Sequence, residues 1–114
     1  MTMGKQSKFE IDEVETASGV TLAIAGDLDL GTIPLLTQRV DGCLAKGAER
    51  LTLDLGELTF MDSSGLRLLI ELCERAKAGR WELALVPSKH EAANLVLRMT
   101  GADAALPFEE PPSP

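Results

Sequence analysis

The sequence predicts an α/β domain with a mixed β-sheet, and three observations support this. Apolar residues alternate with period two in some segments and recur at helical spacing in others, and the two kinds of segment take turns along the chain. The first two strand-like segments follow each other directly, so the sheet should open with an antiparallel pair. A length of 114 residues with 45% hydrophobic residues suits one domain. We expect four to five strands with helices packed on the sheet.

The first half of the chain predicts a hairpin followed by a helix. Strands are expected at 9–14 and 20–26, because a short polar link that ends in glycine separates them. Thr32 can cap a helix whose first turn tolerates Pro34, and the apolar stripe of this helix ends before Gly47. The helix returns the chain to the sheet.

The next segment repeats the strand and helix pattern. A strand is expected at 51–55, and the strand–helix–strand order predicts a parallel crossover. From Leu66 the apolar residues recur with helical spacing until Gly79, and a further strand follows at 81–86. The apolar residues of this second helix cover roughly 200° of its circumference, which is more than one sheet contact needs.

The last part of the chain predicts a third helix and a short edge strand. Ser88 and Glu91 fit a capping box, so the helix should start there and run to about Met99. Residues 105–108 could add an edge strand.

The domain is expected to span residues 8–108. The polar residues 1–7 and the proline-rich residues 109–114 contain too little apolar surface to order themselves, so both termini are predicted to be disordered.

Composition excludes several classes of partner. Lys and Arg total 11 against 18 Asp and Glu, which gives a formal charge of −7 and opposes binding to nucleic acid or to anionic membrane surfaces. No run approaches the roughly 20 apolar residues of a membrane span, so we expect a cytoplasmic protein. Cys43 and Cys73 are expected to be buried small hydrophobic residues rather than a disulfide.

The most informative segment is 58–66, which crosses from a strand to a helix and contains Asp62, Ser63 and Ser64. Asp62 or Ser63 can act as the N-cap, since a short side-chain oxygen accepts hydrogen bonds from the unpaired N–H groups of the first turn. Capping alone could explain the pattern. It would also hold two hydroxyl groups at a fixed, exposed position.

The neighbouring residues argue against an enzyme. A serine nucleophile would need His90, the only histidine, and the glycine that a nucleophile elbow requires is replaced by Met61 before Ser63. A phosphate-binding loop fails because Ala48 stands where lysine is needed. No residues have the spacing of a metal site, so we expect neither catalysis nor a bound metal or cofactor.

Two other groups of side chains could form a binding surface. Carboxylates near the strand ends could meet on one rim in a parallel sheet; they are Asp27, Asp29, Asp54 and Asp62. On the second helix, Leu68 and Leu72 could pack against a neighbouring helix or form an exposed docking strip, and such a strip would suit self-association as well as a partner. Its polar face has i,i+4 pairs that join Glu71 to Arg67 and to Arg75.

Several segments together resemble the STAS domains, and within them the bacterial anti-sigma factor antagonists. The resemblance rests mainly on Phe60-Met61-Asp62-Ser63-Ser64-Gly65-Leu66, which is similar to the signature loop of the family. Supporting similarities are Gly26-Asp27-Leu28-Asp29, Leu53-Asp54-Leu55 and Arg98-Met99-Thr100-Gly101. The resemblance implies a STAS-like sheet and a regulatory protein that is not an enzyme.

The resemblance also implies a mechanism. In this family the serine after the aspartate, here Ser63 with Ser64 as the fallback, is phosphorylated by an anti-sigma factor that is also a serine kinase and that supplies ATP and Mg²⁺. The unphosphorylated antagonist binds that kinase and releases a sigma factor, and a PP2C-like phosphatase resets the switch. The expected partner-binding residues are Asp27, Asp29, Thr59, Asp62, Ser63, Ser64, Gly65, Leu66, Leu68 and Leu72.

A second function stays open within the same family. STAS domains also serve as non-phosphorylated binding subunits of lipid-transport ABC complexes or of stress-sensing assemblies. Relatives in lipid transport often lack the first serine, so the presence of Ser63 favours the signalling branch.

Overall fold

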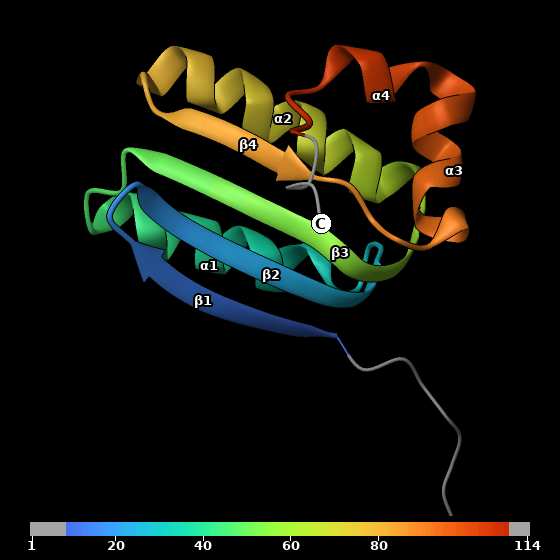
Figure 1. The fold of residues 1–114 in the computed structure, drawn as a ribbon, viewed down its shortest axis with the longest axis horizontal. Coiled ribbons are helices and arrows are strands. Elements are labelled where there is room, and N and C mark those ends of the chain that lie inside the picture. The colour runs from blue at the N-terminus through green and yellow to red at the C-terminus, as the bar shows by residue number, and fades with distance from the viewer. Residues whose placement is uncertain (1–8, 110–114) are drawn as a thin grey trace, which may run out of the picture.

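The computed structural model describes residues 9–109, which form one mixed four-stranded sheet with helices packed on it (Figure 1). The strands lie in the order β1-β2-β3-β4. Strands β1 and β2 pair antiparallel, whereas β2 with β3 and β3 with β4 pair parallel. The predicted mixed sheet with an antiparallel start is confirmed. The strands are β1 (Glu10–Thr16), β2 (Gly19–Leu28), β3 (Arg50–Met61) and β4 (Glu82–Val86).

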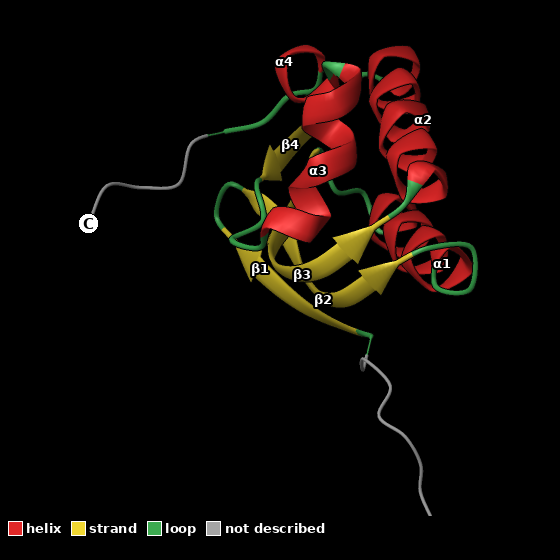
Figure 2. Cartoon of the chain, turned by 90° about the vertical axis from the view of Figure 1, so that its right-hand side faces the viewer, coloured by secondary structure: helices red, strands yellow, loops and turns green. Residues whose placement is uncertain are grey.

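Two long helices cover one face of the sheet, where they lie side by side (Figure 2). They are α1 (Ile33–Ala45) and α2 (Ser63–Gly79). A third helix, α3 (Glu91–Thr100), packs against β3 and leads into the single turn α4 (Ala102–Ala105). None of the helices within 9–109 is long and apolar enough to cross a membrane.

The core lies between the sheet and helices α1 and α2. Every second residue points inward in β2 from Leu22 onward and in β3 up to Leu55, as the period of a strand requires, and Leu22 and Leu53 are fully buried there. Leu36 of α1 and Leu69 of α2 are buried opposite them. Burying one such side chain contributes about 1.5–3 kcal/mol, so this layer carries most of the stability.

Strand β3 is longer than its sequence pattern predicts. The alternation of apolar residues indicates a strand at 51–55, but the strand continues to Met61. Two register shifts against β2, one between Ala23 and Ala25 and one between Gly26 and Asp27, accompany the extra length. Because of this extension, β3 ends directly before Asp62, at the candidate loop.

The predicted capping box before α3 is wrong. Ser88 is buried, and its hydroxyl donates to the carbonyl oxygen of Leu58 over 2.6 Å and accepts from the N–H of His90 over 2.9 Å. His90 is the N-cap residue of the helix, with no side-chain cap, and Glu91 pairs with Arg98 instead. Ser88 therefore ties the start of α3 to β3 rather than capping the helix.

Residues 105–108 do not form the predicted edge strand. Ala105 belongs to α4, and only one isolated parallel bridge, from Leu85 to Phe108, extends the sheet beyond β4. Glu109 was expected in the disordered tail, yet its N–H donates to the carbonyl oxygen of Leu85 over 2.7 Å and its carboxylate pairs with Arg50. The rest of the predicted disordered termini, 1–7 and 110–114, lies outside the described residues.

Both cysteines are free thiols. Cys43 is part of the hydrophobic core, and this burial raises the pKa of its thiol. Cys73 is partly exposed on α2. The expectation of no disulfide is confirmed, and the expectation of full burial holds for Cys43 alone.

Candidate functional site

Asp62 caps the start of α2 through its side chain. Its Oδ1 accepts from the N–H of Ser64 over 2.9 Å and from the N–H of Gly65 over 3.1 Å. Its carbonyl oxygen then accepts the first regular helical bond, from the N–H of Leu66. Of the two predicted N-cap residues, Asp62 is confirmed, and Ser63 becomes the first residue of the helix.

Gly65 fixes the position of this helix start against the end of β2. A Cβ atom at this position would lie 2.6 Å from Cγ of Met61 and 2.9 Å from the carbonyl oxygen of Leu28. The same carbonyl accepts the N–H of Asp62 over 3.4 Å. Only glycine allows the backbone to approach this closely, so the two serines are held in a fixed place beside the sheet.

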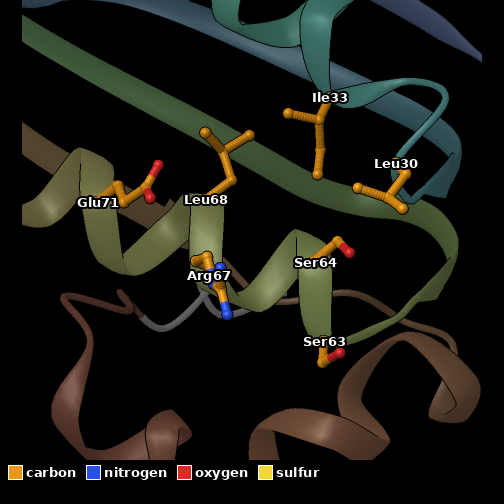
Figure 3. Close-up of a pocket in the computed structure, with 7 residues that line it drawn as sticks. All are labelled: Leu30, Ile33, Ser63, Ser64, Arg67, Leu68 and Glu71. Atoms are coloured by element: carbon orange, nitrogen blue, oxygen red, sulfur yellow. The ribbon is translucent and has the colours of Figure 1, made fainter.

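The two serine side chains lie on the rim of a shallow hollow of about 300 Å³, which we call the serine hollow (Figure 3). Ser63 is exposed and Ser64 is half-buried, and neither hydroxyl group forms a hydrogen bond within residues 9–109. An exposed hydroxyl without an internal partner is available to another molecule. The serine hollow is lined by Leu30, Ile33, Ser63, Ser64, Arg67, Leu68 and Glu71.

The carboxyl ends of β2 and β3 bring Asp27 and Thr59 together. The Thr59 hydroxyl lies 3.0 Å from Oδ1 of Asp27 and 3.1 Å from the carbonyl oxygen of Gly26. The residue after Thr59 pairs with Asp27 in the β2–β3 register. These two predicted residues therefore form one polar group at the strand ends.

Asp29 stabilises the loop in which it lies. Its Oδ1 accepts from the N–H groups of Gly31 over 3.0 Å and of Thr32 over 3.2 Å, which is a local turn around its own side chain. The Thr32 hydroxyl donates to the carbonyl oxygen of Asp27 over 2.8 Å rather than capping α1. Thr32 is the N-cap residue of α1, as predicted, but its side chain stabilises the loop with Asp29 instead of capping the helix.

Asp54 lies apart from Asp62, although both were expected on one rim of the sheet. It lies within β3, where its Oδ1 accepts the N–H of Gly56 over 2.9 Å, and it lines a separate hollow with Glu57 and Lys89. Since a strand rises about 3.3 Å per residue, Asp54 and Asp62 are roughly 25 Å apart along the chain path. The expectation of one rim fails because β3 continues beyond 55.

The leucines that were expected on the partner surface are buried in the domain. Leu72 is 0% exposed, Leu68 6% and Leu66 8%. They belong to the core cluster, so most of the broad apolar arc of α2 packs inside the domain, whereas Ile70 stays 42% exposed. The prediction of an exposed docking strip is therefore wrong, and the alternative of packing within the domain is confirmed. Of these three leucines, Leu68 alone lines the serine hollow.

The polar face of α2 also differs from the prediction. Arg75 pairs with Asp41 of α1 over 2.8 Å, and Glu71 forms no ion pair with Arg67 or Arg75. Arg67 is exposed and unpaired within the described part of the chain. Sequence reasoning also missed Leu30, which is 76% exposed on the edge of the serine hollow, because nothing in a loop pattern indicates which element it faces.

The side chain of His90 lies near the carboxylate of Glu57 and is not hydrogen-bonded to either serine. Its Nε2 is 3.9 Å from Oε1 of Glu57, and within 9–109 no hydrogen bond joins it to Ser63 or Ser64. The Glu57 carboxylate accepts a hydrogen bond from Lys89, which lowers the pKa of Glu57. No group of His, Cys, Asp and Glu residues in the described range has the arrangement of a metal site.

The fold and this site together define a small α/β binding domain that presents two hydroxyl groups at a helix start. The sequence matches the model of the STAS domain over residues 8–110, so the chain belongs to the STAS domain family. A comparison with curated proteins found no match.

Solved structures of similar fold include anti-sigma factor antagonists. One from Mycobacterium paratuberculosis has a TM-score of 0.76 and 22% sequence identity, over 89% of this chain and 85% of that one. The antagonist SpoIIAA in its unphosphorylated form has a TM-score of 0.71 and 19% identity, over 93% and 90%. The phosphorylated form of the Bacillus SpoIIAA has a TM-score of 0.66 and 19% identity, over 93% of each chain. At these identities the likeness establishes the fold.

Proposed function

We propose that this chain is an anti-sigma factor antagonist that is switched by phosphorylation. The unphosphorylated chain binds an anti-sigma factor that is also a serine kinase, and this binding releases a sigma factor. The kinase, with its own ATP and Mg²⁺, then phosphorylates Ser63 and ends the interaction. A PP2C-like phosphatase restores the hydroxyl. The chain itself performs no catalysis, holds no cofactor and acts in the cytoplasm.

The observation that carries this proposal is the Ser63 hydroxyl, which is exposed at a rigid helix start and has no hydrogen-bond partner within 9–109. A kinase needs such an acceptor, whereas a hydroxyl used only for capping would be bonded to the helix. The capping is done by Asp62. Membership of the STAS family and the fold shared with antagonists, one of them solved in a phosphorylated form, support the same function.

Phosphorylation would change the binding surface without unfolding the domain. A phosphate on Ser63 adds about −1.5 to −2 charges beside Asp62, and at ~6 Å the repulsion is on the order of 1–5 kcal/mol for effective dielectrics between water and a protein surface. A domain with the usual stability of ~5–15 kcal/mol tolerates this, as Asp62 and Gly65 remain anchored. A partner packed on the serine hollow would meet a new anion and lose a hydroxyl donor.

Phosphorylation by a cognate kinase tests the proposal. Wild-type chain, Ser63→Ala and the matched control Ser64→Ala are incubated with kinase and ATP, and phosphate incorporation is followed by mass spectrometry. We expect Ser64→Ala to accept phosphate and Ser63→Ala to accept none while still binding the kinase. Incorporation into Ser63→Ala at the wild-type rate would show that the assigned site is wrong. Failure of the unphosphorylated chain to bind any kinase of this class would contradict the function.

A further inference from the structure

Arg67 lies on the same helix as the acceptor hydroxyl, and its positive charge has no partner in the described part of the chain. It lies four residues after Ser63 and three after Ser64, which places it one helical turn away from both. It lines the serine hollow with them (Figure 3). Its side chain is exposed, and its guanidinium group forms no ion pair or hydrogen bond with any residue in 9–109, although Glu71 is one turn further along.

The start of α2 offers a phosphate little else to bind. The N–H groups of Ser64 and Gly65, which could otherwise hold an anion at a helix N-terminus, already donate to the carboxylate of Asp62. That carboxylate also repels a phosphate on the adjacent residue. Among the residues that line the serine hollow, Arg67 carries the only positive charge. A dianion attached to Ser63 is therefore drawn along the helix toward Arg67.

We propose that Arg67 is the intramolecular partner of the phosphate on Ser63. The i,i+4 order, with the anion nearer the helix N-terminus and the cation nearer the C-terminus, is the favourable one. The guanidinium group can donate two parallel hydrogen bonds to phosphate oxygens. The inference rests on the proposed function only for the identity of the modified residue.

This pairing makes phosphorylation change two features of the surface at once. In the unmodified chain, the serine hollow presents the Ser63 hydroxyl and the Arg67 guanidinium group, neither of which has a partner within 9–109. In the phosphorylated chain, the hydroxyl is lost and the guanidinium group is engaged within the same helix. A binding partner that used Arg67 would lose it at the same step.

The pKa of phosphoserine 63 tests the pairing without any kinase. Phosphoserine is incorporated at position 63 during translation, and the second ionisation of the phosphate is followed by ³¹P NMR over a pH titration. Arg67 lowers this pKa when it pairs, whereas Asp62 and Glu71 raise it. We expect the pKa in Arg67→Gln to be higher than in the wild type by about 0.2–0.4 pH unit, which is the size of an exposed i,i+4 ion pair.

Two variants serve as controls. Arg75→Gln removes the same charge from the same helix, but Arg75 pairs with Asp41 on α1, so the phosphate pKa should stay at the wild-type value. Arg67→Lys should restore part of the shift. If Arg67→Gln and the wild type have the same phosphate pKa, the pairing is overturned. This result is independent of whether a kinase modifies Ser63, so failure of the pairing can be told apart from failure of the proposed function.

Discussion

Gly65 has no room for a side chain, because the start of α2 lies directly on Leu28 and Met61. We predict that Gly65→Ala destabilises the domain by about 1–3 kcal/mol, since the helix or the strand must move apart to admit a methyl group. Urea unfolding followed by circular dichroism measures this. The matched control is Gly42→Ala within α1, where no atom outside the helix's own adjoining backbone and the two chain neighbours lies within 4 Å of the added methyl group.

That control should be neutral or stabilising by up to about 1 kcal/mol, because alanine is the better helix former. Equal urea midpoints for Gly65→Ala and the wild type would mean that the close approach at Gly65 is not a constraint on the fold.

At the site, the role of a single residue could be predicted from the sequence where that role depends only on neighbouring residues. The cap of α2 could be narrowed to Asp62 or Ser63, because capping depends on a short side chain and on N–H groups two and three residues later, and the structure assigns it to Asp62. Leu30 and Arg67 could not be found this way. Leu30 reaches the serine hollow from the β2–α1 loop, and Arg67 forms no ion pair within 9–109 although Glu71 lies at i,i+4 from it on the same helix.

At the scale of elements, Ser88 connects β3 to the start of α3. We predict that Ser88→Ala lowers the free energy of unfolding by about 1–2 kcal/mol, because it removes the buried hydrogen bonds to the Leu58 carbonyl and from the His90 N–H. Amide hydrogen exchange should also become faster at His90 and through the first turn of α3.

Ser18→Ala is the control, since Ser18 is exposed in the turn between β1 and β2. We expect it to leave both the stability and the exchange at His90 unchanged. Unaltered exchange at His90 in Ser88→Ala would contradict the connecting role of this hydroxyl.

The type and order of the main elements could be predicted from the sequence, because each has a clear period of apolar residues. The lengths of the elements could not be predicted. In the last part of β3, buried and exposed residues no longer alternate, because the register against β2 shifts there. The broad apolar arc of α2 was correctly recognised, but a helix pattern cannot say whether a neighbour or solvent lies opposite. Here Leu72 is covered within the domain.

At the scale of the whole molecule, exposed ion pairs give the stability a dependence on acid pH. A hydrogen bond from Lys89 lowers the pKa of Glu57, and one from Arg98 lowers the pKa of Glu91. A carboxylate whose pKa is lower in the folded state adds stability above its ordinary value of about 4.3, and this is lost as the pH falls through the lowered pKa.

We therefore predict that the combined variant Glu57→Gln and Glu91→Gln loses less stability than the wild type when the pH falls from 6 to 3. Urea midpoints at each pH measure the difference, which should be small because both carboxylates are exposed. Glu74→Gln is the control, as Glu74 forms no ion pair in the described part of the chain. An identical loss in the combined variant and the wild type would contradict the prediction.

The short contact between Phe108 and β4 has a consequence for how copies of this protein behave at high concentration. A sheet can add strands from another molecule at an open edge, which is a route to aggregation. At β4, an incoming strand must first displace the backbone bonds that join Leu85 to the segment ending at Glu109. At β1, the other edge, it must approach a strand that carries Glu10, Asp12, Glu13 and Glu15. One edge is thus covered by the chain and the other is protected by charge.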